Sequence, residues 1–148
     1  MAATKLFMNW TTVTWTPLPS GTPVTIDKVT SVKPKLDTDV ERFKGDADRF
    51  YRAIASPTNN RSVDVDTGDI SALLLIPVNT PGTLSATLGD VYNGFTAGGG
   101  GITITLTPCI CTGRPFSGDH AKFASGTATF EGYSPTDGVT DPLTVVAL

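Results

Sequence analysis

The sequence predicts an all-β protein with one short helix. Thr occurs 24 times among 148 residues, and β-branched side chains fit the pleated surface of a strand. The 15 Gly and 11 Pro are spread along the chain, where they mark turns between short strands. With 39 % hydrophobic and only 17 % charged residues, the chain is too apolar for a disordered tail. We expect one domain over residues 1–148 with a long extended loop.

The N-terminal segment, residues 1–20, predicts a strand or arm. It mixes two Trp with Thr in an alternation that contains one irregularity, and Pro17 and Pro19 end it because proline cannot sit inside a central ladder. Residues 22–26 alternate again. A bulge near Asp27 would join them to the apolar positions that follow.

Residues 33–60 are the most polar part of the chain and read as a hairpin with a long excursion. We place an extended loop or arm at 37–60. A solvated loop or a short helical turn is one interpretation; an arm that reaches another subunit is the functional one, because exposed aromatics rimmed by charge are typical of interfaces. The anchors of such an arm would be Arg42, Phe43, Arg49, Phe50, Tyr51 and Arg52.

Residues 62–66 predict a strand with Val63 and Val65 on its buried face, which leaves Asp64 and Asp66 on the opposite face. Residues 69–76 then form the one good helix candidate, with a buried strand as the alternative. Thr67 or Asp69 would cap the helix, and Pro77 would stop it. The expected buried positions of the helix are Ile70, Leu73 and Leu74.

The second half of the chain predicts further strands separated by loops. Residues 102–107 alternate strictly, and their expected partner is 83–88, across a glycine-rich connection. Pro108 to Asp119 is expected to be a loop. Residues 121–133 alternate again, and the apolar end of the chain, 143–148, should close a sheet edge.

The sequence lacks the motifs of the common catalytic and metal sites, so we expect no enzyme, no cofactor and no metal. The single His120 lies in a surface-type loop, and no Gly-x-Ser-x-Gly turn supplies a nucleophile. Cys109 and Cys111 would share one face of a strand as free thiols, without a metal-ligand spacing. The tetraglycine Gly98–Gly101 precedes a strand and lacks the Lys-Ser/Thr of a phosphate loop. Residues 64–69 resemble a calcium loop only faintly, because no Glu stands at the bidentate position.

The net charge of −3 and the scattered basic residues argue against a protein that binds nucleic acid through its phosphates. No apolar run is long enough for a membrane span, and the N-terminus lacks a secretory signal. We therefore expect synthesis in a cytoplasm and no membrane partner.

The order of these segments resembles the tail tube (major tail) proteins of long-tailed bacteriophages. The resemblance covers about residues 20–148 and leaves the segment 1–20 outside it. It rests on Gly45-Asp46-Ala47-Asp48, Ser62-Val63-Asp64-Val65-Asp66-Thr67-Gly68-Asp69-Ile70, a Leu-rich segment, Pro81-Gly82-Thr83-Leu84-Ser85-Ala86-Thr87, and the turn-rich stretch from Ala128 to Leu143.

The resemblance implies a β-sandwich or barrel-like subunit with a short flanking helix, six of which form a ring. Such rings stack into a tube in the virion, assembled in the host bacterial cytoplasm, with the tape-measure and other tail proteins as partners. DNA would pass through the lumen without specific binding, and the acidic residues expected to face that lumen are Asp64, Asp66 and Asp69.

The alternative from another class is a viral decoration, host-attachment or carbohydrate-binding β-sandwich module. Its stacking platforms would be Trp10, Trp15, Tyr92 or Tyr133.

Overall fold

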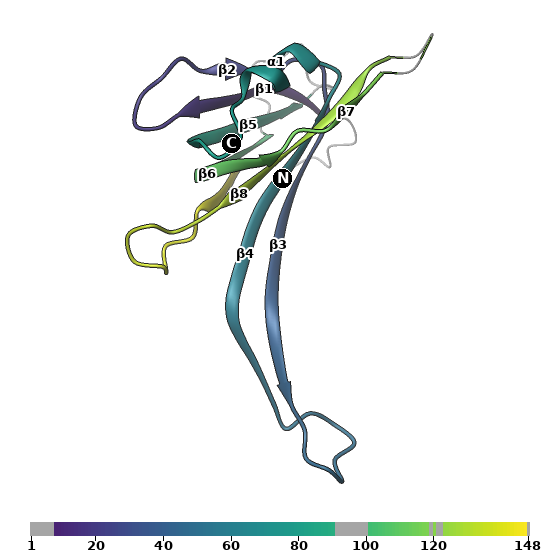
Figure 1. Ribbon diagram of the computed structural model, residues 1–148, viewed down its shortest axis with the longest axis vertical. Coiled ribbons are helices and arrows are strands. Elements are labelled where there is room, and N and C mark those ends of the chain that lie inside the picture. Colours follow the sequence, from purple (N-terminus) through teal and green to yellow (C-terminus); the bar gives the residue numbers. More distant parts are fainter. Residues whose placement is uncertain (1–7, 91–100, 119, 121–122, 148) are drawn as a thin grey trace, which may run out of the picture.

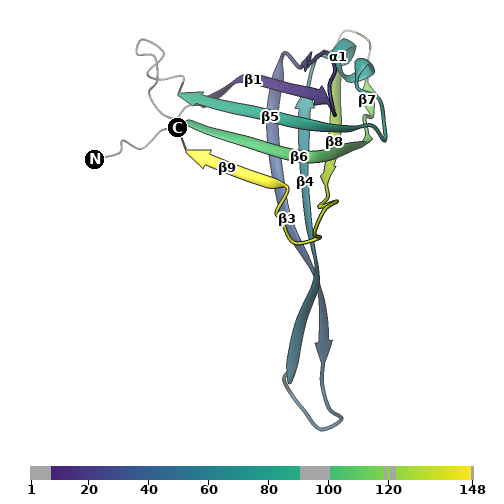
Figure 2. The same cartoon turned by 90° about the vertical axis from the view of Figure 1, so that its left-hand side faces the viewer.

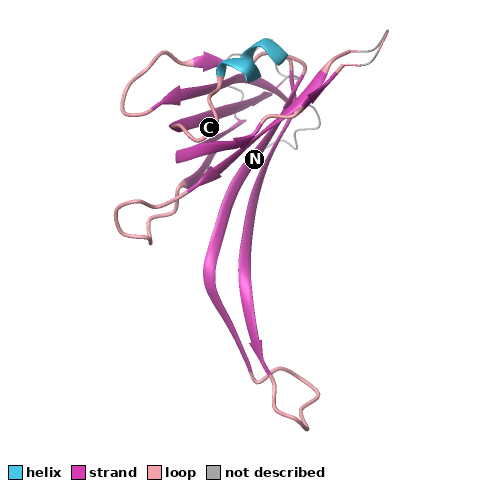
Figure 3. Cartoon of the chain, viewed as in Figure 1, coloured by secondary structure: helices cyan, strands magenta, loops and turns pink. Residues whose placement is uncertain are grey.

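A computed structural model describes residues 8–90, 101–118, 120 and 123–147. These residues form nine strands and one short helix (Figures 1 and 3), which confirms the predicted all-β class with one helix. The elements are β1 (Met8–Pro17), β2 (Val24–Thr25), β3 (Val29–Phe43), β4 (Ala53–Thr67), α1 (Ile70–Leu75), β5 (Pro81–Asp90), β6 (Gly101–Gly113), β7 (Phe116–Ser117), β8 (Ser125–Gly132) and β9 (Leu143–Ala147).

The strands pair in the order β2-β1-β5-β6-β8-β4-β3, with β9 added to β6 and β7 to β8. Every ladder is antiparallel. The sheet changes direction at strand β6. The first half of β6 pairs with β9 and its second half pairs with β8. Figure 2 shows the result, with β1, β5, β6 and β9 crossing the direction of β3 and β4. The sheet thereby curls over and covers its own apolar face.

The core lies inside this curl and joins residues from both ends of the sheet. Val13 and Trp15 on β1 are buried together with Val63 and Val65 on β4 and Phe130 on β8. The alternating positions of these strands explain the burial, because every second side chain points inward. The predicted strands at 62–66, 83–88 and 102–107 are confirmed, as is the pairing of β5 with β6. Of the alternating segment expected at 121–133, the structure forms β8 from Ser125 to Gly132.

Helix α1 begins at Asp69, whose carboxylate accepts a hydrogen bond from the Ala72 backbone N–H at 3.2 Å. This confirms Asp69 as the cap. Leu73 and Ile76 are fully buried, but Leu74 is 55 % exposed, so its predicted burial is wrong. A helix of six residues presents one narrow face to the sheet, and Leu74 lies beside that face.

The predicted loop from Pro108 to Asp119 is also wrong in its first half, because β6 continues to Gly113. The register between β5 and β6 shifts between Gly82 and Leu84, opposite Thr107 and Pro108. Proline is tolerated at such a bulge, where a ladder donor is missing in any case. Beyond it Cys109 and Cys111 resume the inward alternation.

One smaller expectation also changes. The bulge expected near Asp27 is a break between β2 and β3, with Lys28 in the left-handed region at φ 54°. The ladder irregularity itself lies between Val29 and Ser31.

Among the described residues, no helix is long and apolar enough to cross a membrane.

Candidate functional site

The β3–β4 hairpin is the longest feature of the molecule and extends far beyond the body of the sheet (Figures 1 and 2). Both strands have 15 residues, yet β4 pairs with β8 only from Ser62 to Thr67. We call residues 29–34 and 61–67 the root, and residues 35–60 the arm. In the described part of the sheet, the arm strands have no ladder partner except each other.

The arm is a two-stranded ribbon without a core of its own. Its side chains are exposed apart from a few, such as the half-buried Val40. Polar cross-strand contacts accompany the ladder: Thr38 Oγ1 donates to Asn59 Oδ1 at 3.2 Å, and Asn60 Nδ2 donates to Asp39 Oδ1 at 3.4 Å. An isolated two-stranded ribbon is marginal in water, so the arm depends on its root or on a further partner.

The range 37–60, expected as an extended loop or arm, therefore contains two paired strand ends and the nine residues 44–52 that join them. In this tip, Asp48 accepts from the Gly45 backbone N–H at 2.8 Å and from Arg52 Nε at 2.6 Å. The Arg52 backbone N–H donates to the Phe43 carbonyl, which closes the turn. The tip is thus organised within the subunit.

All six residues predicted as interface anchors lie at the arm's end. The Arg42 guanidinium stacks over the Tyr51 ring, 5.8 Å from its centroid. Arg52 pairs with Asp48 within the tip. Phe50 is 83 % exposed. The exposed large apolar side chains of the arm are Leu36, Phe43, Phe50, Tyr51 and Ile54.

This concentration of apolar side chains is unusual for a segment with no core. Large exposed apolar patches mark sites where another macromolecule binds, and four of these five side chains lie within residues 43–54. The free backbone edges add to the effect, because an unpaired strand is a template for another chain.

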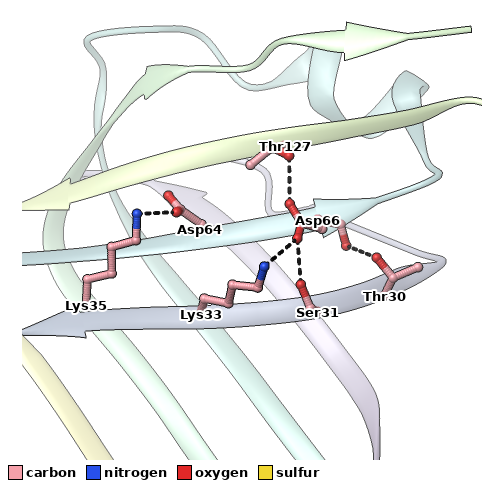
Figure 4. Close-up of polar contacts among 7 residues, drawn as sticks. All are labelled: Thr30, Ser31, Lys33, Lys35, Asp64, Asp66 and Thr127. Carbon is pink, nitrogen blue, oxygen red and sulfur yellow. Dashed lines mark hydrogen bonds and ion pairs between the residues drawn. The ribbon is translucent and has the colours of Figure 1, made fainter.

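The root carries the acidic residues that the sequence placed in a lumen. Asp64 and Asp66 lie on the face of β4 opposite Val63 and Val65, as predicted. In Figure 4 two lysines of β3 lie beside them: Lys35 Nζ is 2.8 Å from Asp64 Oδ2, and Lys33 Nζ is 3.6 Å from Asp66 Oδ2. This face therefore alternates in charge and is not uniformly acidic, because β3 supplies a cation for each carboxylate.

Asp66 is the most heavily used of these carboxylates. It accepts from Ser31 Oγ and from Thr127 Oγ1, both at 2.6 Å, so it ties β3, β4 and β8 together (Figure 4). These two hydroxyls, Ser31 foremost, hold the pKa of Asp66 below its ordinary value, with Lys33 as a smaller cause. Asp64 acts in the same way on Lys35, because its hydrogen bond and charge raise the lysine pKa.

The third predicted lumen residue, Asp69, is separated from this pair by its role as helix cap. Its Oδ2 also accepts the Asp27 backbone N–H at 3.1 Å. The structure thus brings Asp64 and Asp66 into one polar network and leaves Asp69 in a separate one.

Sequence reasoning missed a brace at the base of the arm. Arg61 Nε donates to Asp141 Oδ2 at 3.2 Å, and the Asp141 Oδ1 accepts the Leu143 backbone N–H at the start of β9. The pair connects β4 to a segment 80 residues away in sequence. Only the pairing of distant strands reveals it, so no local pattern would have found it.

The other residues singled out in the sequence lie in the core, at the surface or outside the described residues. Cys109 and Cys111 are free and buried, as predicted, and burial raises the pKa of Cys109 to about 12. His120 is exposed, as expected. Trp15 is fully buried and cannot be a stacking platform, whereas Tyr92 and the Trp10 side chain lie outside the described residues. The described part of the chain holds no cluster of metal-ligating side chains.

Comparison with solved structures finds a chain of similar fold in the cryo-EM structure of the anti-feeding prophage (AFP) baseplate, 6-fold symmetrised. The TM-score is 0.58 at 11 % sequence identity, and the match covers 99 % of this chain and 97 % of that chain. At this identity the likeness shows a shared fold over the whole length. No protein-family model matches the sequence. No curated protein matches it either.

Proposed function

We propose that this chain is a structural subunit of a phage-tail-like particle, and more specifically a tail tube subunit whose copies form rings that stack. The observation that carries the proposal is the arm: a 15-residue strand pair whose outer half is exposed, apolar at its end and open at its edges. A second copy of the chain would cover these features.

The comparison supports the same class of function. The similar chain belongs to a baseplate analysed with sixfold symmetry, and a closed ring of six is the number we propose here. In such an assembly the protein acts by its geometry, so we propose no catalytic activity and no cofactor. Its partners would be its own copies, the tape-measure protein and other tail proteins, within the virion.

A conduit for DNA should not hold the phosphates that pass along it. The net charge of −3 suits that role, because a protein that binds DNA strongly needs clustered Lys and Arg. The assignment of Asp64, Asp66 and Asp69 to the lumen remains a prediction. Lys33 and Lys35 beside two of them make a nearly neutral lining there, which would be non-adhesive without being strongly repulsive.

Shortening the arm tests the proposal. Replacing residues 38–59 with Asn-Gly joins the paired residues Asp37 and Asn60 through a two-residue hairpin turn and keeps the root intact. We expect the wild-type chain to form rings or tubes in negative-stain electron microscopy, and the shortened chain to remain folded without stacking.

The matched control is Val78→Ser, which removes an exposed apolar side chain from the loop between α1 and β5, outside the arm and the root. It should assemble as the wild type does. A wild-type chain that stays monomeric at high concentration, or tubes formed by the shortened chain, would contradict the proposal.

A further inference from the structure

The end of the β3–β4 ribbon opposite the arm holds a pocket of about 810 Å³. It lies where β3 starts and β4 ends, against the β7–β8 hairpin at the other end of the long axis from the arm tip (Figure 1). We call it the head pocket. Its lining includes Lys28, Thr30, Gly68, Phe116, Phe123 and Ala124.

The head pocket presents apolar side chains to solvent. Phe123 is fully exposed and Phe116 is 56 % exposed, although both line a concave site. The one carboxylate in the lining, Asp66, is occupied by Ser31, Thr127 and Lys33. Among the lining residues that the structure describes, most side chains are therefore apolar or uncharged, and the one free charge is that of Lys28.

Lys28, at the edge of the head pocket, has a backbone conformation that is unusual for lysine. It adopts φ 54°, a left-handed conformation that Gly or Asn adopts more easily than Lys. The Gly68 backbone N–H donates to the Lys28 carbonyl at 3.1 Å, which fixes this conformation but does not involve the side chain. Lys28 forms no ion pair with any residue that the structure describes. The Lys28 ammonium is therefore available to pair with a carboxylate outside the subunit.

The arm tip carries an exposed aromatic ring and an exposed carboxylate. Phe50 is 83 % exposed, and Asp46 is exposed without a hydrogen bond or ion pair to any described side chain. Both belong to residues 44–52, which also carry the exposed cations Lys44 and Arg49. The head pocket presents a cation together with two aromatic rings.

We infer that the head pocket receives the arm tip of a second copy of this chain, with Phe50 seated against Phe116 and Phe123 and Asp46 paired with Lys28. This inference rests on the proposed function, since it names the surface on which the arm of a stacked subunit docks.

The two surfaces lie at opposite ends of one continuous ribbon, about 50 Å apart for a 15-residue strand. A contact between such unlike surfaces is head-to-tail, and it builds an open stack where the rotation between copies does not close a ring. The ribbon would therefore set the stacking direction from one subunit to the next.

Charge reversal tests the pairing, with the critical concentration for assembly measured by sedimentation. Lys28→Asp and Asp46→Lys should each raise that concentration about tenfold, and the double variant should return to within about threefold of wild type. Asp tolerates the left-handed region, so the first variant keeps its fold. Lys28→Asn should weaken assembly as well, while leaving the melting temperature of the subunit equal or higher.

A mixing experiment tests whether the arm docks in the head pocket without relying on charge reversal. The shortened-arm chain keeps its head pocket, and a Lys28→Asp/Phe123→Ser chain keeps its arm. Neither should stack alone, but the mixture should give a complex with equal amounts of the two. Val78→Ser again serves as the control for loss of an exposed apolar side chain.

The outcomes separate the inference from the proposed function. If shortening the arm blocks stacking but the charge variants behave as wild type, the arm docks elsewhere and the inference fails alone. Single variants that weaken assembly without rescue in the double variant also overturn the pairing. If the shortened chain still stacks, the proposed function and the inference fail together.

Discussion

The root and the arm of the β3–β4 ribbon are made of the same two strands, yet one is part of a folded core and the other is not. In the root, Val63 and Val65 are fully buried and β8 covers the free side of β4. In the arm, Ile54 at the same kind of strand position is 64 % exposed. The difference lies in what packs on each half and not in the ladder, which continues from one half into the other.

This difference shows that backbone pairing alone does not bury the side chains of a strand. The root gains stability from burial and from the Asp66 network, whereas the arm has only its own cross-strand contacts. The arm is therefore only marginally stable in the isolated subunit, and the apolar side chains at its end stay exposed until another surface covers them.

The largest expected contrast comes from placing a charge in each half. Val65→Asp would bury an unpaired carboxylate in the core and should lower the free energy of unfolding by about 4 kcal/mol or more. Ile54→Asp should change it by less than about 0.5 kcal/mol, because the site is exposed. Urea unfolding followed by circular dichroism measures both. Equal losses would show that the arm belongs to the cooperative core.

Within the root, the two carboxylates should differ. Asp66→Ala removes the acceptor of two hydroxyls and a lysine, and should cost about 2 kcal/mol. Asp64→Ala breaks one exposed ion pair with Lys35 and should cost less than about 1 kcal/mol. Comparable losses in urea unfolding would mean that the network around Asp66 adds nothing beyond a surface pair.

The pH dependence of the root follows from the lowered pKa of Asp66. Because the folded-state pKa lies below the ordinary value of 3.8, the stabilisation is complete above that value and is lost as the pH falls through the folded-state pKa. The difference in unfolding free energy between wild type and Asp66→Asn should therefore shrink as the pH drops below about 4. Subtraction removes the parallel effect of Asp137, whose pKa is lowered by Thr140 and Val139. A difference that is constant with pH would contradict the assignment.

The last expected effect lies at the arm tip and is small. Arg52→Ala breaks the ion pair with Asp48. Because the Arg52 side chain is well exposed, the substitution should change the stability of the subunit by less than about 1 kcal/mol. Thermal unfolding measures the change. A large loss of stability would show that the tip supports the fold, in conflict with its role as a contact surface.

The sequence predicted the root better than the arm. Period-two alternation identified the strands around Val63, Leu84, Ile104 and Phe130, because each has one buried face. The arm strands have no buried face and so no alternation, and they read as an extended loop. Helix α1 was found from its cap at Asp69, but a helix of six residues is too short for its pattern to show that Leu74 lies off the buried face.

For the candidate site, the sequence identified the residues but not their partners. It placed Phe50 and Tyr51 among exposed residues and Asp64 opposite Val63, because these follow from composition and strand periodicity. It missed Lys33 and Lys35 beside the carboxylates, since that requires the β3–β4 register. The head pocket was also missed, because it joins three segments that are distant in sequence.

Amide hydrogen exchange compares the two halves most directly, in the isolated subunit at low concentration and in the assembled particle. Residues 29–34 and 61–67 should be protected in both states, because β8 and the core cover them. Residues 35–43 and 53–60 should exchange rapidly in the subunit and become protected on assembly. Equal protection of the arm in both states, or rapid exchange in the assembled particle, would contradict the claim that other copies of the chain cover the arm.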